Sequence, residues 1–192
     1  MQNNQSQVED GSVIRVEDKF VDPTRLIKKV GIKSGDRVAD FGCGPGYFSI
    51  PIAKTIGEDG EVFAFDVLPS ALSALESQAK IQGVDNIAIK RVNLEKKQGT
   101  RLENESVDWV VLKNILFQND KKRNIIKEAY RILRKGGKIL IMEWDKNLSV
   151  GPAQKMRISP QELIEIIDRE EFIFEKQLPA GNYHYVIIAV KL

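Results

Sequence analysis

Three glycines at alternate positions follow a short apolar run, and this pattern constrains the fold more than any other stretch of the chain. The run is Val38–Phe41, it contains Asp40, and the glycines are Gly42, Gly44 and Gly46. Glycine adopts positive φ and carries no Cβ, so the backbone can turn sharply and a ligand can approach it closely. A helix that follows such a turn presents unpaired N–H groups toward the same place. The sequence therefore predicts a strand, a ligand-contacting turn and a helix in succession.

The spacing of these glycines bears on the kind of ligand. Glycine-rich turns between a strand and a helix also bind nicotinamide and flavin dinucleotides, with the pattern G-x-G-x-x-G. Here the pattern is G-x-G-x-G, and Tyr47 stands where a dinucleotide site has its third glycine. The spacing favours another ligand and leaves a nicotinamide-dependent oxidoreductase as the least favoured function.

Beyond this turn the chain alternates between apolar strands and amphipathic helices. Strands are expected at 62–65, 87–89, 107–112, 138–142, 172–178 and 183–191. Helical spacing covers 23–30, 48–56, 69–82, 125–135 (ended by the glycines at 136–137) and a segment that begins at the capping box 159–162. Pro51 fits its helix only within the first turn. The pattern predicts an α/β fold whose parallel sheet is covered on both faces and closes with an antiparallel hairpin.

The composition is that of one ordinary globular domain. The chain has 192 residues and a formal net charge of only +2, which does not favour nucleic acid or an acidic membrane as a partner. Residues 1–17 are polar and predict a mobile tail before a single domain at 18–192; the alternative is a flap that orders over a bound ligand. No run is long enough to span a membrane and no signal peptide is recognisable, so we expect a cytoplasmic protein. The single cysteine, Cys43, excludes a multi-cysteine metal site, and no metal is expected.

Polar residues stand at the ends of the expected strands, where ligands bind in open α/β sheets. Asp66 follows Gly46 by 20 positions, and an acid at that distance can accept hydrogen bonds from both hydroxyls of a ribose. The alternative for Asp66 is a solvated acid at a strand end. Asn93 can contact an adenine edge or can simply form a turn. Cys43 fits a small packed residue better than a nucleophile.

Four segments in order carry a resemblance to a known family. They are Val38–Gly46, Ala64–Asp66, Ser106–Val111 and Glu128–Gly137. Together they resemble class I S-adenosylmethionine-dependent methyltransferases, in particular the branch of ubiquinone/menaquinone biosynthesis methyltransferases (methyltransferase type 11). The resemblance implies a Rossmann-like sheet of seven strands in the order 3-2-1-4-5-7-6, mostly parallel with strand 7 antiparallel, and helices on both faces. It also implies methyl transfer from S-adenosylmethionine to a small-molecule acceptor, which leaves S-adenosylhomocysteine.

The resemblance assigns roles to particular positions. In the family the glycine turn lines the methionine portion of the cofactor, the acid before it orients the loop, and the acid after the second strand holds the ribose. Residues after the second and third strands border the adenine, and the position after the fourth strand faces both cofactor and acceptor. In this chain the implied cofactor-binding set is Asp40, Gly42, Cys43, Gly44, Gly46, Asp66, Val67, Asn93, Leu94 and Lys113. Many relatives have histidine after the fourth strand, where this chain has Lys113 and Asn114.

Catalytic candidates follow from the chemistry of methyl transfer. Displacement at a sulfonium needs alignment and exclusion of water, and a general base only if the acceptor must lose a proton. The family's last strand runs backwards, so its beginning lies beside the ends of the other strands. His184 is therefore expected near Glu143 and Trp144, where an ordinary histidine pKa suits a base or a substrate contact; a structural role is the alternative. The candidates are His184, Asn114 and Glu143, ahead of Asp145.

Other functions stay open at this point. Between residues 113 and 138, nine Lys/Arg stand against two Asp/Glu, and such an excess can contact RNA phosphates, although solvated basic helix faces are common. A protein methyltransferase and a cofactor-binding regulator without transfer activity are further alternatives. Aromatic residues near the expected site favour a small apolar or aromatic acceptor. They are Phe117, Trp144, Tyr183 and Tyr185. The sequence predicts no oligomeric state.

Overall fold

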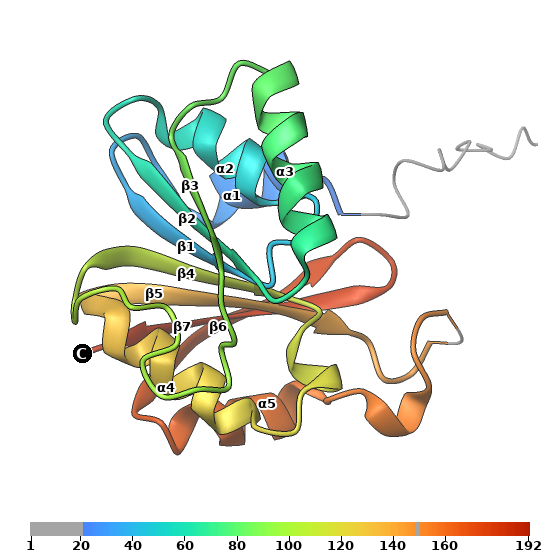
Figure 1. Ribbon diagram of the computed structural model, residues 1–192. Helices are drawn as coiled ribbons and strands as arrows, with labels where there is room; N and C mark the ends of the chain where they lie inside the picture. Colours follow the sequence, from blue (N-terminus) through green and yellow to red (C-terminus); the bar gives the residue numbers. More distant parts are fainter. Residues whose placement is uncertain (1–20, 149) are drawn as a thin grey trace, which may run out of the picture.

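The computed structural model describes residues 21–148 and 150–192, so the expected polar tail at 1–17 lies outside the described residues. Its seven strands form one sheet in the order β3-β2-β1-β4-β5-β7-β6 (Figure 1). Strands β1 to β5 pair in parallel, whereas β7 lies antiparallel to both β5 and β6. The predicted fold class, strand order and antiparallel strand 7 are confirmed.

The element bounds follow the expected alternation closely. The strands are β1 (Arg37–Phe41), β2 (Glu61–Asp66), β3 (Ile87–Arg91), β4 (Val107–Lys113), β5 (Leu133–Trp144), β6 (Phe172–Ala180) and β7 (His184–Lys191). Within the described residues, the α-helices are α1 (Pro23–Val30), α2 (Ser49–Ile56), α3 (Pro69–Ile81), α4 (Lys122–Ile132) and α5 (Pro160–Asp168). The short 3₁₀ helices of the same part of the chain are η2 (Leu116–Gln118) and η3 (Gln154–Met156).

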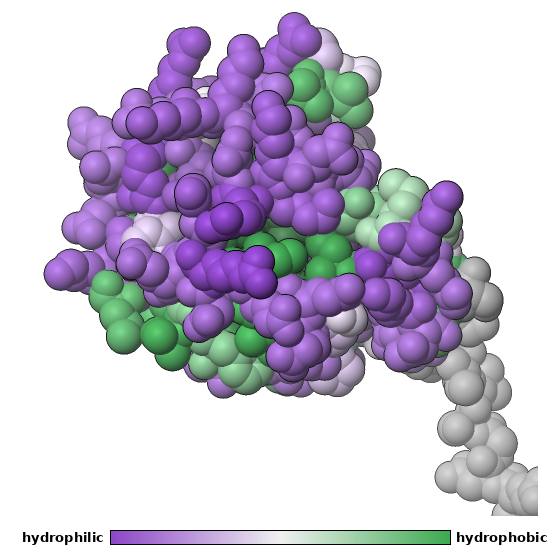
Figure 2. Space-filling model, turned by 90° about the horizontal axis from the view of Figure 1, so that it is seen from below, coloured by the Kyte–Doolittle hydropathy of each residue, from purple (hydrophilic) through white to green (hydrophobic). Residues whose placement is uncertain are grey.

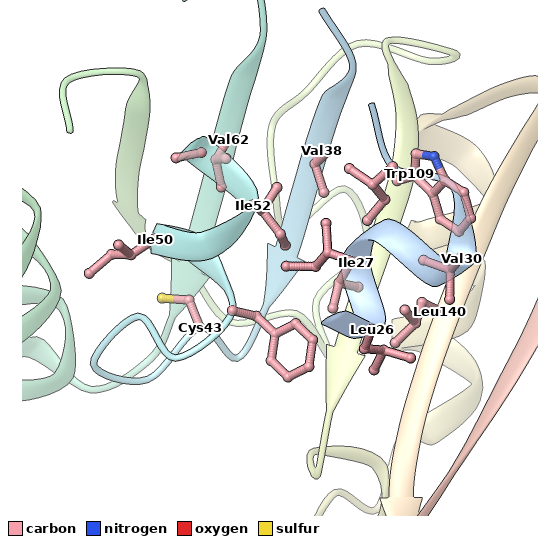
Figure 3. Close-up of a cluster of buried hydrophobic side chains, with 14 of the residues drawn as sticks. Leu26, Ile27, Val30, Val38, Cys43, Ile50, Ile52, Val62, Trp109 and Leu140 are labelled. Atoms are coloured by element: carbon pink, nitrogen blue, oxygen red, sulfur yellow. The ribbon is translucent and has the colours of Figure 1, made fainter. Parts of the chain in front are cut away.

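Two hydrophobic clusters hold the helices on opposite faces of the sheet. Helices α1, α2 and α3 cover one face, and α4 and α5 cover the other (Figure 1). In the first cluster, Ile27 of α1 and Ile52 of α2 lie against Val38 of β1 (Figure 3). Because the central strands are buried on both faces, they are apolar along nearly their whole length, which is why the sequence shows them as continuous apolar runs.

Local chemistry explains where the helices begin. Asp22 caps α1 by accepting a hydrogen bond from the Arg25 N–H at 3.2 Å. Helix α2 begins at Ser49, so Pro51 lies in the first turn, where its missing N–H costs nothing. The predicted capping box of α5 is present, with Ser159 and Glu162 bonded reciprocally.

One boundary was predicted wrongly. The helix expected to end at the glycines 136–137 ends at Ile132, and β5 begins at once with Leu133. The two glycines belong to an irregular start of β5. Gly136 has φ of +73°, and a Cβ on Gly137 would lie 2.8 Å from the Arg134 carbonyl oxygen. Glycine serves a strand bulge as well as it ends a helix, and the sequence does not distinguish the two uses.

The surface over α4 and α5 is mainly hydrophilic. Figure 2 shows this side, with hydrophobic residues gathered in a central furrow and along one edge. Within residues 21–148 and 150–192, no helix is long and apolar enough to cross a membrane.

Candidate active site

A cavity of ≈ 500 Å³ opens at the carboxyl edge of the sheet, beside the glycine turn. It is bordered by the ends of β1 to β4 and by the segment around η2. Its lining consists of Gly42, Gly44, Asp66, Val67, Leu68, Val92, Asn93, Leu94, Glu95, Lys113, Asn114, Ile115, Gln118, Asn119 and Ile125. Seven of the ten residues of the predicted cofactor-binding set are in this lining, together with Asn114. Asp40, Cys43 and Gly46 lie behind the cavity wall.

The three glycines of the turn differ in what surrounds them. All three have positive φ. A Cβ on Gly44 would meet nothing within 4 Å, so the backbone here faces open space. A Cβ on Gly42 would lie 2.3 Å from Ile115 Cγ2, and one on Gly46 would lie 2.4 Å from Leu75 Cδ1. Gly44 therefore offers its backbone to a ligand, whereas Gly42 and Gly46 allow the turn to pack against its neighbours.

Asp66 joins the end of β2 to the glycine turn. Its Oδ2 accepts a hydrogen bond from the Gly44 N–H at 3.0 Å, and its Oδ1 accepts one from the Leu68 N–H at 2.9 Å. These bonds fix the carboxylate on the cavity wall. Each carboxylate oxygen retains a lone pair, so both can still accept a bond from a ligand hydroxyl.

Asp40 and Cys43 support the turn from behind. Asp40 is 1% exposed and accepts a hydrogen bond from Ser49 Oγ at 2.6 Å. Burial raises the pKa of Asp40 to about 6, and the Ser49 bond opposes that rise. Cys43 is buried in the same cluster as Ile50 and Ile52 (Figure 3), and burial raises the pKa of its thiol. An inert packed cysteine agrees with this placement.

The residues expected to border an adenine lie at the far end of the cavity. Val67 is 51% exposed at the end of β2, and Asn93 and Leu94 follow β3. The Asn93 side-chain oxygen accepts a hydrogen bond from the Glu95 N–H at 2.9 Å, so Asn93 does form a turn. Its amide nitrogen is left for other partners.

Lys113, at the end of β4, borders the opposite end of the cavity. Its ammonium lies 4.9 Å from the centre of the Tyr47 ring, a distance at which the ring face attracts a cation. The Tyr47 hydroxyl donates in turn to the Val21 carbonyl before α1. Burial lowers the pKa of Lys113, while the nearby Asp40 and Glu143 act in the other direction.

Asn114 and His184 meet across the sheet edge, although 70 positions separate them. Asn114 Nδ2 lies 3.1 Å from His184 Nε2. Burial and the charge of Lys113 lower the pKa of His184 to about 4, so the imidazole is uncharged at neutral pH. An uncharged imidazole accepts from the Asn114 amide at Nε2 in the tautomer that carries its proton on Nδ1. As expected from the reversed last strand, His184 pairs with Trp144 in the sheet, and the ring centres are 4.1 Å apart.

Comparison with known proteins agrees with this fold and with the sequence motifs. A family model for the methyltransferase domain matches residues 32–181. The chain belongs to the class I S-adenosylmethionine-dependent methyltransferases. The predicted family is thus confirmed, and with it the expectation that S-adenosylmethionine is the cofactor.

Curated relatives point to the same branch of the methyltransferases. The ubiquinone/menaquinone biosynthesis C-methyltransferase UbiE of Pectobacterium carotovorum is 26% identical over 168 residues, which cover 84% of this chain and 62% of that protein. The demethylmenaquinone methyltransferase of Anoxybacillus flavithermus is 23% identical over 125 residues, which cover 65% of this chain and 52% of that protein. This methyltransferase therefore spans about half to three-fifths of the length of these relatives.

A solved structure shares the whole fold. A SAM-dependent methyltransferase from Aquifex aeolicus superposes with a TM-score of 0.83 at 22% identity, covering 91% of this chain and 92% of that one. The same fold also occurs, with a TM-score of 0.74 and 15% identity, in the [4+2]-cyclase SpnF. Fold alone therefore does not determine the reaction.

Glu143 lies behind the wall of the methyltransferase cavity. It is 1% exposed. Its Oε1 accepts a hydrogen bond at 2.9 Å from the N–H of Leu116, the first residue of η2. Burial raises the pKa of Glu143 to about 7. Among the described residues, Glu143 Oε2 and Asn114 Oδ1 are the two buried side-chain oxygens without a hydrogen-bond partner. Glu143 therefore positions the cavity-lining segment around η2 and does not border the cavity itself.

Sequence reasoning missed Arg157. This residue is 5% exposed and donates hydrogen bonds to four carbonyl oxygens of the segment after β5. The acceptors are Asp145 at 2.7 Å, Leu148 at 2.7 Å, Val150 at 2.9 Å and Pro152 at 2.8 Å. A Cβ on Gly151, in the same segment, would lie 2.5 Å from the Trp144 ring. Arg157 thus fixes the segment that packs on Trp144, and nothing local in the sequence indicates this contact.

Proposed function

We propose that this methyltransferase binds S-adenosylmethionine in the cavity beside Gly44 and transfers its methyl group to a small-molecule acceptor at the Lys113 end. The observation that carries the proposal is the open space over Gly44 next to the fixed carboxylate of Asp66. An exposed turn backbone beside an acid at the end of the second strand suits a nucleoside with a charged tail.

The cofactor would be held by the residues that the sequence motifs indicate. Gly42 and Gly44 would contact the methionine portion through the backbone, and Asp66 would accept hydrogen bonds from the ribose hydroxyls. Val67 would pack on the adenine, with Asn93 and Leu94 at its edge. Asp40, Cys43 and Gly46 would act from behind by keeping the turn in shape.

The chain's own residues mainly align the reactants. The cofactor supplies an activated methyl group on a sulfonium, so the protein has to bring the acceptor into line and exclude water. His184, with its lowered pKa, is uncharged at neutral pH, and its Nε2 lies 3.1 Å from Asn114 Nδ2. We assign Asn114, which lines the cavity, to the wall that positions the acceptor. His184 lies outside that lining and would hold the Asn114 side chain in place, and Glu143 would support η2.

A small-molecule acceptor is better supported than RNA. Of the nine basic residues between 113 and 138, five pair with carboxylates. They are Arg123, Lys127, Arg131, Arg134 and Lys138. Basic side chains that are already paired have less to offer phosphates. The quinone-pathway names of the curated relatives also favour a small-molecule acceptor.

Two measurements test the proposal. In titration calorimetry we expect S-adenosylmethionine to bind and NADH to bind more weakly; tighter binding of NADH would contradict the cofactor assignment. Incubation with labelled cofactor and a cell extract, followed by separation into metabolites, RNA and protein, should place the label in the metabolites. Label in RNA or protein alone would contradict the acceptor class, and no label in any fraction would favour a regulator that binds without transferring.

A further inference from the structure

Lys113 brings a positive charge to the proposed acceptor end of the cavity, and within residues 21–148 and 150–192 no carboxylate forms an ion pair with it. Its ammonium lies over the face of the Tyr47 ring. The side chain is half-buried and borders the cavity. An ammonium has three donors and no acceptor capacity, so this site offers hydrogen bonds to a ligand.

The acidic groups nearest to Lys113 are engaged elsewhere. Asp40 accepts from Ser49, and Glu143 accepts from the backbone at the start of η2. Both are almost fully buried, so neither can move to the cavity without leaving its partner. Their charges favour the ammonium form of Lys113 from a distance and do not saturate its donors.

The other groups around Lys113 are uncharged and largely apolar. They include the ring of Tyr47, the side chain of Ile115 on the cavity wall, and the imidazole of His184. A sulfonium bound in this cavity would add a second positive charge beside Lys113. An anionic oxygen on the acceptor would interact favourably with both charges, whereas a cationic acceptor would be repelled by both.

We propose that Lys113 selects the acceptor: it binds an anionic oxygen, a carboxylate or phenolate, on a small molecule whose remaining body is apolar. This inference rests on the proposed function, since it assumes that the same cavity holds the cofactor. The cofactor also has a carboxylate, so the experiment has to separate the two sources of the anion.

The experiment compares two ligands of the same shape and different charge. The protein is first saturated with S-adenosylhomocysteine, and the binding of 2-naphthoate and 2-naphthamide is then measured by calorimetry. We expect wild type to bind the carboxylate about tenfold more tightly than the amide, as for one charge-assisted hydrogen bond in a half-buried site. Lys113→Gln should bring the ratio close to one, and Lys113→Arg should keep most of it. The matched control is Lys135→Gln, an exposed lysine near the start of β5 and away from the carboxyl edge of the sheet, which should leave the ratio unchanged.

Each outcome separates the inference from the proposed function. If wild type does not bind S-adenosylhomocysteine, the proposed function fails. If it binds the cofactor product but shows no preference for naphthoate, or binds neither probe, the inference alone fails. If the Lys113→Gln variant still binds naphthoate more tightly than naphthamide, the inference is also overturned. Loss of cofactor affinity in Lys113→Gln with an unchanged ratio would assign Lys113 to the cofactor's own carboxylate and overturn the acceptor role.

Discussion

The two ends of the cavity are built in different ways. The proposed cofactor end is made largely of backbone: the N–H groups of the turn after β1 are bonded to Phe65 and Asp66 at the end of β2, 22 or 23 positions further along the chain. The acceptor end joins the ends of β4 and β5 to the beginning of β7, with Asn114 and His184 in contact. One end is a local motif, and the other exists only when the sheet is complete.

This difference teaches where specificity can change. In the proposed site, backbone N–H groups and one carboxylate would recognise the cofactor, so changes to most neighbouring side chains would leave cofactor binding intact. The acceptor end depends on individual side chains such as Lys113 and His184, and each can be replaced without altering the glycine turn. If the two ends are independent, a substitution at one should leave the other unaffected, and the following predictions test that.

The largest effect should come from Arg157, which fixes the segment against Trp144. Arg157→Met removes hydrogen bonds to four carbonyl oxygens and should lower the free energy of unfolding by about 4 kcal/mol. Urea denaturation measures this, with Arg25→Met, exposed on α1, as control. Affinity of the folded variant for S-adenosylhomocysteine should stay within twofold of wild type. A parallel loss of that affinity would show that the two ends are coupled.

The next effect separates two glycines of the same turn. Gly46→Ala places a Cβ against the fully buried Leu75 at a φ of +96° and should lower the free energy of unfolding by about 3 kcal/mol. Gly44→Ala meets open space and should cost about 1 kcal/mol, from its positive φ. In calorimetry, however, Gly44→Ala should weaken cofactor binding more than Gly46→Ala weakens it. Equal stability losses would contradict this division between packing and binding.

Asp66 should matter for affinity at the cofactor end alone. Asp66→Ala removes the proposed acceptors for the ribose hydroxyls and should weaken S-adenosylmethionine binding by about 2 kcal/mol, close to thirtyfold. Asp59→Ala, in an exposed turn, is the matched control and should leave the dissociation constant unchanged. An unchanged constant in Asp66→Ala would exclude the ribose role.

The smallest expected effects, per pH unit, are changes in how the free energy of unfolding depends on pH, and they arise from Glu143 and His184. The pKa of Glu143 is about 7 when folded and 4.5 as its ordinary value, so its contribution to stability is present below pH 4.5 and lost as pH rises through 7. The pKa of His184 is about 4 when folded and 6.5 as its ordinary value, so its contribution is present above pH 6.5 and lost as pH falls through 4. Each slope is at most about 1.4 kcal/mol per pH unit.

Between pH 4.5 and 6.5 the two contributions oppose each other. Glu143→Gln should therefore make the unfolding free energy rise more steeply with pH in this window, and His184→Gln should make it fall. Urea denaturation at half-unit pH steps measures both slopes. Slopes identical to wild type in both variants would contradict the pKa shifts.

The sequence motifs and the sheet topology that the family resemblance implies were predictable from sequence, whereas contacts outside the motifs were not. The glycine turn, Asp66 and the reversed last strand that places His184 beside Trp144 follow from short motifs and from the resemblance to the family. The role of Arg157 could not be predicted, because its carbonyl partners lie in a segment without regular structure. The helix end predicted at Gly136 and Gly137 was wrong for a related reason. The local sequence there is equally compatible with the end of a helix and with a strand bulge.

The insertion of β7 between β5 and β6 has a consequence for how such an enzyme diversifies. Because this strand runs against the others, the tip of its hairpin with β6 arrives where the remaining strands finish. Lengthening or exchanging that tip would reshape the proposed acceptor end of the cavity and leave the glycine turn and Asp66 unchanged. Acceptor specificity can thus change through substitutions in this hairpin, while the proposed cofactor site is retained.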